Sequence, residues 1–162
     1  MMNNHSHDTA KRAHTNHYKR LLAMTGLSFV AMYVLMYAMV NRVDNALGNL
    51  NQIYMAGLMT SSMVVIELAL MGSMYDNKRR NALIVSVATA ALIAFWIFTR
   101  QQTAISDKQF LRSMIPHHGG AILMCQRAPI GDADIKRLCQ GIIASQQAEI
   151  DQMKSKLRDL RR

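Results

Sequence analysis

The sequence predicts an all-α protein with three transmembrane helices followed by an antiparallel helical hairpin outside the membrane. Three long apolar runs predict the transmembrane helices, at about residues 21–40, 54–75 and 82–99. Two helical patterns separated by a turn predict the hairpin. The 162-residue chain is therefore expected to comprise a polar tail, a transmembrane region and a hairpin, at residues 1–20, 21–100 and 101–162.

Each apolar run is long enough to form a membrane helix. An apolar stretch of about 20 residues crosses the roughly 30 Å hydrocarbon core of a bilayer. The first and third runs contain no charged residue, and the second contains only Glu67. The remaining chain is too small to bury three such helices in a soluble protein. The first run is also longer than the roughly 7–15 apolar residues of a signal peptide, so we expect it to be retained.

The distribution of positive charge predicts the orientation in the membrane. The tail and the second loop carry most of the flanking cations, at Lys11, Arg12, Lys19, Arg20, Lys78, Arg79 and Arg80. Because cytoplasmic segments carry the excess of Lys and Arg, both are expected in the cytoplasm. Three spans then place the hairpin on the outer face, which is the periplasmic side of a bacterial inner (cytoplasmic) membrane. Topology thus accounts for the net charge of +9, and the expected partner is the lipid bilayer, not nucleic acid.

Residues 101–162 carry the signals of two helices joined by a turn. Ser106 followed by Gln109 fits a capping box, in which each side chain bonds the other's backbone N–H. Apolar residues then recur at intervals of three and four. Gly131 suits a turn, and Asp132 suits the N-cap of a second helix. Because the loop is short, the two helices are expected to be antiparallel neighbours.

Cys125 and Cys139 set the register of the predicted hairpin, because the midpoint between them falls in its loop. In two antiparallel helices of equal rise, the residue numbers of any two facing residues add up to the same value. If the cysteines face each other, His118 therefore lies level with Gln146. Several polar and sulfur side chains then fall within about two turns of one another. They are Met114, His117, His118, Gln146, Glu149 and Met153.

This set of side chains suits a metal ion. Imidazole is the commonest protein metal ligand, and thioether sulfur selects soft ions such as Cu(I). Pro116 removes a helical hydrogen bond, and Gly119 and Gly120 loosen the next turn, so a distorted helix can aim both histidine rings at one ion or let each ring bind a different one. In the alternative, one histidine packs in the interface and bonds Gln146 or Glu149, while the other is solvated.

The two cysteines have two interpretations. A disulfide across the hairpin is favoured, since an oxidising periplasm permits it. A thiolate metal pair or redox switch is the alternative, which the lack of CxxC spacing disfavours.

Two stretches of the hairpin resemble a known family. They are FLRSMIPHHGGAILMCQRAPI and DIKRLCQGIIASQQAEIDQM, and they are similar to the domain of unknown function 305 family, whose signature is Met-Ile-x-His-His-x-x-Ala-Ile-x-Met followed by Ile-x-x-Ser-Gln-x-x-Glu-Ile-x-x-Met. The resemblance implies a ferritin-like fold, of which this hairpin is half a four-helix bundle. Some periplasmic members bind copper and contribute to copper resistance. The implied ligands are Met114, His117, His118, Met124 and Met153.

The chain departs from soluble members of this family in having three membrane spans and a single hairpin. A hairpin of this size cannot enclose a core alone. We therefore expect a homodimer, which would complete a four-helix bundle, or docking on the membrane part or on another membrane partner.

Methionines form stripes in the first two spans, at Met24, Met32, Met36 and Met39 and at Met55, Met59, Met63, Met71 and Met74. Glu67 lies within the second stripe, where a carboxylate must face protein or be protonated. A path for soft metal or protons is one interpretation, and packing of irregular helix surfaces by methionine is the favoured one. The tail histidines, His5, His7, His14 and His17, can bind metal loosely or belong to a solvated tail.

The sequence therefore favours a membrane-anchored extracytoplasmic protein that binds copper or a similar soft metal in homeostasis or resistance. One alternative is a structural or interaction module without metal, and another is a small metal-transport accessory subunit that uses Glu67 and the methionine stripes. No nucleophile–base pair, phosphate-binding loop or closed catalytic metal set is visible in the sequence. An enzyme is therefore not predicted.

Overall fold

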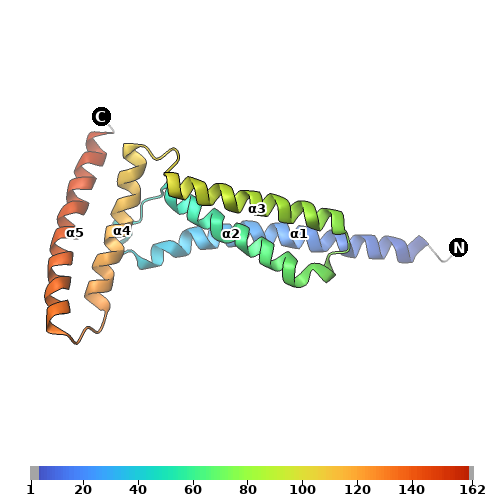
Figure 1. The fold of residues 1–162 in the computed structure, drawn as a ribbon, viewed down its shortest axis with the longest axis horizontal. Coiled ribbons are helices and arrows are strands. Elements are labelled where there is room, and N and C mark those ends of the chain that lie inside the picture. Colours follow the sequence, from blue (N-terminus) through green and yellow to red (C-terminus); the bar gives the residue numbers. More distant parts are fainter. Residues whose placement is uncertain (1–3, 161–162) are drawn as a thin grey trace. The chain divides into compact units, whose positions relative to one another are not determined.

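A computed structural model describes residues 4–160 of the chain, with side chains from His17 onward. Within these residues the protein is helical and has no strand, which confirms the all-α prediction. The order of elements is α1 (Asn4–Leu35), α2 (Leu50–Met71), α3 (Lys78–Gln101), α4 (Asp107–Arg127) and α5 (Ala133–Asp159) (Figure 1). Short 3-10 turns occupy Met36–Met39, Val43–Asn45 and Gly72–Met74.

The helices belong to two compact units. The three-helix unit comprises Met1–Tyr33 and Tyr54–Gln101, and the hairpin unit comprises Val34–Ile53 and Gln102–Arg162. The boundaries differ from the expected ones, because the connection between α1 and α2 belongs to the hairpin unit. The sequence placed that connection in the transmembrane region, because apolar segments precede and follow it. Its contacts with α4 and α5 involve residues far away in the sequence, and no sequence pattern indicates them.

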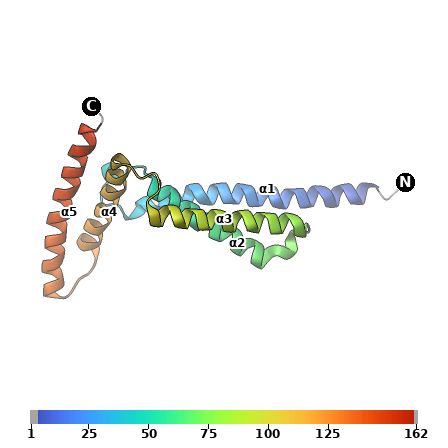
Figure 2. The ribbon, with the colours of Figure 1, turned by 45° about the horizontal axis from the view of Figure 1, so that its top comes forward.

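Three helices of the described chain are long and apolar enough to cross a membrane: His17–Met39, Leu50–Met74 and Lys78–Gln101. Each coincides with its predicted run to within a few residues. Within the three-helix unit, α1, α2 and α3 lie alongside one another (Figure 2). Their small core consists of Leu21, Val64, Leu68, Tyr75 and Ala88. Large apolar side chains such as Leu22, Leu27 and Leu70 stay exposed, as suits helices that face lipid.

The hairpin unit is built on α4 and α5, which pack against each other. Asp132 is the N-cap of α5, and its carboxylate accepts hydrogen bonds from the backbone N–H groups of Asp134 and Ile135 at 2.8 and 2.9 Å. The buried core consists of Ile115, Ile122, Ile150 and Leu157, flanked by Leu47, Leu111, Ile143 and Met153. Leu47 comes from the α1–α2 connection, so this connection covers part of the core that a two-helix hairpin leaves open.

The expected capping box at the start of α4 is wrong. Ser106 is the N-cap, but its side chain makes no capping hydrogen bond. Gln109 instead accepts a hydrogen bond from the backbone N–H of Leu50 at 3.1 Å. The first turn of α2, like any helix start, has backbone N–H groups without partners inside the helix. Gln109 therefore bonds α2 and does not bond back to Ser106 as the capping box requires.

Polar contacts hold the α1–α2 connection against the hairpin helices. The Ser113 hydroxyl donates to Asn49 Oδ1 at 3.2 Å, and Lys154 donates to the Asp44 carboxylate at 2.8 Å. This hydrogen bond from Lys154, with a weaker one from Arg42, lowers the pKa of Asp44 below its usual value. The connection is therefore attached to both helices of the hairpin.

Gly119 and Gly120 allow this connection to approach α4 closely. A Cβ atom on Gly119 would lie 2.7 Å from Asn41 Oδ1 and 3.3 Å from Val40 Cγ1, and one on Gly120 would lie 3.4 Å from the Met39 carbonyl. Asn41 Oδ1 also accepts a hydrogen bond from Asn45 at 2.9 Å. The expectation that these glycines loosen the helix to aim the histidines is therefore wrong, since both lie in an uninterrupted α4 and serve packing.

Replacing Gly119 with alanine should destabilise the hairpin unit by about 1–3 kcal/mol, the usual cost of overpacking. The new methyl group must displace the Asn41 side chain and thereby break its bond with Asn45. Gly141→Ala is the matched control, because nothing lies within 4 Å of its Cβ position, and better helix propensity should stabilise it by about 0.5–1 kcal/mol. Urea unfolding of the full chain in mild detergent measures both, and equal behaviour of the two variants would refute the packing role.

Candidate metal centre

His118 is the centre of the candidate site, and both of its ring nitrogens have partners. The residue is buried, with 6% of its surface exposed. Nδ1 lies 2.9 Å from the Met114 carbonyl oxygen, and Nε2 lies 2.7 Å from Glu149 Oε2 on α5. A carbonyl oxygen only accepts hydrogen bonds, so Nδ1 carries a proton and donates it. The regular i, i+4 spacing within α4 thus fixes the ring and directs Nε2 across to α5.

One feature of this arrangement is shared with metal-binding histidines. Metal-binding histidines almost always donate their second ring N–H to a carbonyl or carboxylate, which fixes the tautomer and makes the free nitrogen more basic. Here the Met114 carbonyl holds Nδ1–H and leaves Nε2 as the only nitrogen available to an ion. The facing Glu149 side chain is about half exposed, at 50%, against 8% for that of His118. An ion can therefore reach the pair from the Glu149 side.

The same pair also satisfies His118 without an ion. With Nδ1 protonated, Nε2 either donates to an ionised Glu149 or accepts from a protonated one, and each form completes the buried ring's hydrogen bonds. This matches the alternative in which one histidine bonds a side chain of the second helix.

His117 does not join this pair. It is exposed, and its ring centroid lies 6.1 Å from that of His118 with the planes inclined by 63°. Pro116 lies inside a continuous α4, so the helix is not distorted enough to bring the rings together. Consecutive residues of a regular helix point about 100° apart, and the structure keeps this separation. The two imidazoles do not converge on one position.

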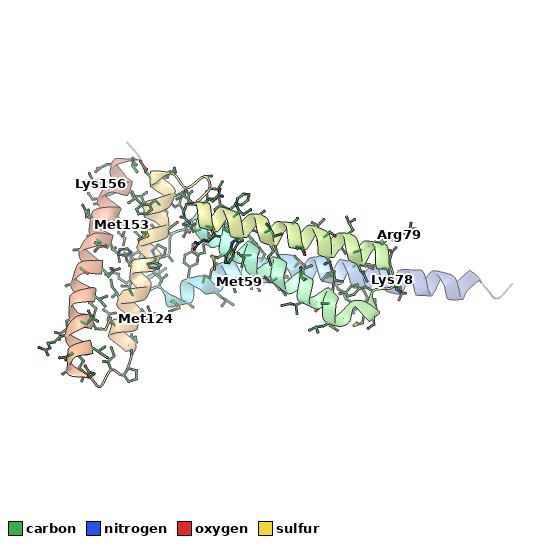
Figure 3. The ribbon with its side chains drawn as sticks, in the orientation of Figure 1. Met59, Lys78, Arg79, Met124, Met153 and Lys156 are labelled. Carbon is green, nitrogen blue, oxygen red and sulfur yellow. A yellow bond between two sulfur atoms is a disulfide. The ribbon has the colours of Figure 1, made fainter. Side chains whose placement is uncertain are left out.

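The methionines lie in different environments. Met153 is partly buried against the apolar core of the hairpin, one turn after Glu149 on α5. Met114 contributes its carbonyl to His118, and its side chain is partly buried. Met124 is 53% exposed and lies on α4 nearer the loop than Met153 does on α5 (Figure 3). Met124 is therefore not part of the His118 cluster.

The expected register holds at the loop end of the hairpin, where Cys125 faces Cys139, and differs by three residues at His118. The residue that meets His118 is Glu149 and not Gln146, and neither ring nitrogen is left for the Gln146 amide. The constant-sum rule assumes straight helices with equal rise, and a small tilt between α4 and α5 is enough to shift the pairing along the hairpin.

The site residues fit a metal in part. In the described part of the chain, no three His, Cys, Asp or Glu side chains come together in a way that could hold an ion. If an ion bound here, His118 and Glu149 would supply two ligands, and further ones would have to be thioethers, with Met114 and Met153 closest along the helices, or come from a second copy. A soft ion is the class that accepts such a set.

Cys125 and Cys139 form a disulfide with a Cα–Cα distance of 5.2 Å. It joins α4 to α5 next to their loop, as in the favoured interpretation of the cysteines. The bond leaves no free thiol for a thiolate metal site, because the chain has two cysteines.

Reducing this disulfide should destabilise the hairpin unit by about 3 kcal/mol, the chain-entropy value for a loop near 15 residues; its separation is 14 residues. Unfolding of the full chain with and without reductant measures the change. A double Cys125→Ser, Cys139→Ser variant is the control and should not respond to reductant. Two thiols that react with an alkylating reagent before reduction would contradict the bridge.

Glu67 has a partner at the end of α2. The Tyr75 hydroxyl donates to its Oε1 at 3.4 Å. The second methionine stripe splits between two environments: Met63 packs on the core, whereas Met55, Met59, Met71 and Met74 are exposed. In the first stripe, Met32 Sδ accepts a hydrogen bond from Thr60 at 3.5 Å. Within one copy the sulfur atoms therefore do not line a common path with Glu67.

Of the tail histidines, the side chains of His5, His7 and His14 lie outside those described.

Sequence reasoning missed the asparagines of the α1–α2 connection. Asn45 is 1% exposed, and its Oδ1 is a buried side-chain atom without a hydrogen-bond partner among the described residues. Four asparagines between residues 41 and 51 were the visible signal, but their roles depend on contacts with α4 that are distant in sequence.

Comparisons with known proteins find a family and a relative that are similar in sequence. The sequence model of the family described as "Domain of unknown function (DUF305)" matches residues 96–157. "Uncharacterized protein L153" of Acanthamoeba polyphaga mimivirus is 38% identical over 138 residues, which covers 83% of this chain and 89% of that protein. This similarity extends well beyond residues 96–157, so it includes much of the apolar region. No solved structure matches the chain. The chain belongs to the family of proteins that contain the DUF305 domain.

Proposed function

We propose that the protein is a membrane-anchored metal-binding protein that holds a soft ion, with copper(I) as the first choice, on the α4–α5 hairpin. The observation that carries this proposal is the orientation of His118. Its Nδ1–H is held by the Met114 carbonyl, and its Nε2 faces the Glu149 carboxylate. His118 and Glu149 would bind the ion, with thioether support from Met114 or Met153. His117 and Met124 are left out of the first set of ligands.

The proposed location is the outer face of a membrane, which is the periplasm for a bacterial inner membrane. The positive charge near the spans supports a cytoplasmic N-terminus, and the disulfide suits an oxidising compartment. A second copy is the proposed partner, because two hairpins form a four-helix bundle and two half-sites supply the ligands that one lacks.

A second candidate function is a structural or interaction module without metal. The observation in its favour is that His118 is fully hydrogen-bonded as it stands. A transport accessory role is less well supported, because Glu67 bonds Tyr75 and most of the stripe methionines of α2 are exposed. If Glu67 does carry protons or metal, Glu67→Gln should abolish transport and leave binding by the hairpin unchanged.

Competition titration tests the proposed function. The full chain in mild detergent is titrated with Cu(I) against a chromophoric chelator, with Zn²⁺ and Ca²⁺ as comparison ions. We expect Cu(I) to bind with a dissociation constant well below about 1 μM, equivalent to more than about 8 kcal/mol, and Ca²⁺ not to bind, since it requires 6–8 oxygen ligands. Binding no tighter than micromolar, or equal for all three ions, would refute the proposal and leave the structural module.

A further inference from the structure

The three-helix unit contains an apolar groove that neither the hairpin nor Glu67 uses. Its volume is about 450 Å³, within the roughly 300–1,000 Å³ of small-molecule sites. All three membrane helices contribute to it. Its wall is aliphatic, with Leu21, Val64 and Ala88 at the base. Leu22, Leu83 and Val87 line it but remain 74%, 63% and 60% exposed, so the groove opens on the outer side of the helices.

The composition of the groove selects a hydrocarbon chain. Its lining includes no charged residue, and its polar members are the hydroxyls of Tyr18, Thr25, Thr60 and Ser61. The Thr25 hydroxyl is occupied by a bond to the Leu21 carbonyl at 2.8 Å, and Thr60 donates to Met32. The Thr25 and Thr60 hydroxyls therefore have partners within the protein, and most of the lining surface is apolar. In a membrane, the abundant molecule that fills such a groove is an acyl chain.

One end of the groove is strongly basic. Tyr18 lines the groove and donates from its hydroxyl to Asn81 Oδ1 at 2.6 Å. The Arg80 guanidinium lies over the same ring, 5.8 Å from its centroid. Lys78 and Arg79 precede Arg80 at the start of α3 (Figure 3). Lys19 and Arg20 follow Tyr18 on α1. Among the described side chains, the exposed cations at this end are therefore Lys19, Arg20, Lys78, Arg79 and Arg80.

We propose that this groove binds an anionic glycerophospholipid, with one acyl chain between α1, α2 and α3 and the phosphate among the cations beside Tyr18. The cluster of cations gives the charge complementarity, since among the side chains that the structure describes the nearby acids are Asp76, in the same loop, and Glu67, whose carboxylate is bonded to Tyr75. Basic pockets between membrane helices bind anionic head groups in this way, each Lys or Arg contributing about fivefold in affinity. The lipid would brace α1 against α3.

Fluorescence quenching tests the proposal on the full chain. Trp96 is the single tryptophan, so Trp96→Phe with Val87→Trp places one reporter at the rim of the groove. Trp96→Phe with Leu27→Trp is the matched control, since Leu27 is 72% exposed, is not part of the groove lining and lies at a similar distance along its helix from the basic end. Vesicles of phosphatidylcholine contain a small, equal fraction of either brominated phosphatidylglycerol or brominated phosphatidylcholine.

The reporter at Val87 should be quenched more strongly by brominated phosphatidylglycerol than by brominated phosphatidylcholine, whereas the Leu27 reporter should not distinguish them. Adding Arg79→Gln and Arg80→Gln should strongly weaken the preference, because three of the five cations remain, and Lys108→Gln on α4 should leave it unchanged. Equal quenching at Val87, a preference that is as strong at Leu27, or a preference that loss of both arginines leaves unchanged would overturn the proposal.

Native mass spectrometry of the unsubstituted chain gives an independent result that needs no tryptophan at the rim. With equal amounts of the two lipids in detergent, phosphatidylglycerol should remain bound in preference to phosphatidylcholine by about fivefold or more. The same preference should be clearly smaller in the Arg79→Gln, Arg80→Gln variant, whose helix content is checked by circular dichroism. Equal retention of both lipids would show a general lipid annulus and contradict a site.

Discussion

Replacing His118 with alanine should weaken Cu(I) binding by at least about 100-fold, or about 2.7 kcal/mol. Its Nε2 is the only nitrogen that the Met114 bond leaves free, and it faces Glu149 at 2.7 Å. His117→Ala removes the same kind of ring from the adjacent position and is the matched control. Because that ring is exposed and lies 6.1 Å away by centroid, its loss should change the affinity by less than about threefold.

Glu149→Gln extends this comparison. The amide preserves the shape of the side chain but replaces the charged oxygen ligand with a neutral one, so we expect about a 10-fold loss of affinity, or about 1.4 kcal/mol. Competition titration of the full chain measures all three variants. If His117→Ala is as harmful as His118→Ala, the ion binds by a geometry that this structure does not contain, and the assignment of His118 and Glu149 is wrong.

Replacing Ile150 with alanine should destabilise the hairpin unit by about 2–5 kcal/mol, the usual cost of a large-to-small change in a core. Ile150 is fully buried at 0% exposure and packs with Ile115, Ile122 and Leu157. It also immediately follows Glu149, so loss of this packing should weaken the position of that carboxylate. Urea unfolding and Cu(I) titration of the same preparation measure both effects.

Ile135→Ala is the matched control for this change. Ile135 lies on the same helix but is 49% exposed, so removing its side chain should cost less than about 1 kcal/mol. A similar cost for the two substitutions would mean that Ile135 is covered, as it would be in a four-helix bundle with a second copy. In that case unfolding should depend on protein concentration, and the isolated hairpin unit would not be the folding unit.

The sequence predicted the helices well because the signals for them are local. Uninterrupted apolar runs identified the three long helices to within a few residues. Asp132 identified the start of α5, because an N-cap is satisfied by N–H groups two and three residues further on. Ser106 shows the limit of such reasoning. It is an N-cap by position, but the box partner Gln109 bonds Leu50, which is distant in sequence.

The candidate site was predicted less accurately because it depends on relations between segments. His118 and Glu149 were both named, and a bond from a buried histidine to Gln146 or Glu149 was one alternative, but the choice of Glu149 depends on how α4 packs on α5. The role of Gly119 and Gly120 depends on the close approach of Asn41 and Met39, which no local pattern contains. Pro116 suggested a distorted helix, but α4 accommodates it without interruption.

Metal content is the most direct measurement of the central claim, which is that His118 and Glu149 form the nucleus of a soft-metal site. The full chain is produced with copper in the growth medium and purified in mild detergent without chelators, alongside His118→Ala, and both are analysed by elemental mass spectrometry. We expect near-stoichiometric copper in the unsubstituted protein and only background in the variant. Background copper in both proteins, or equal copper in both, would contradict it.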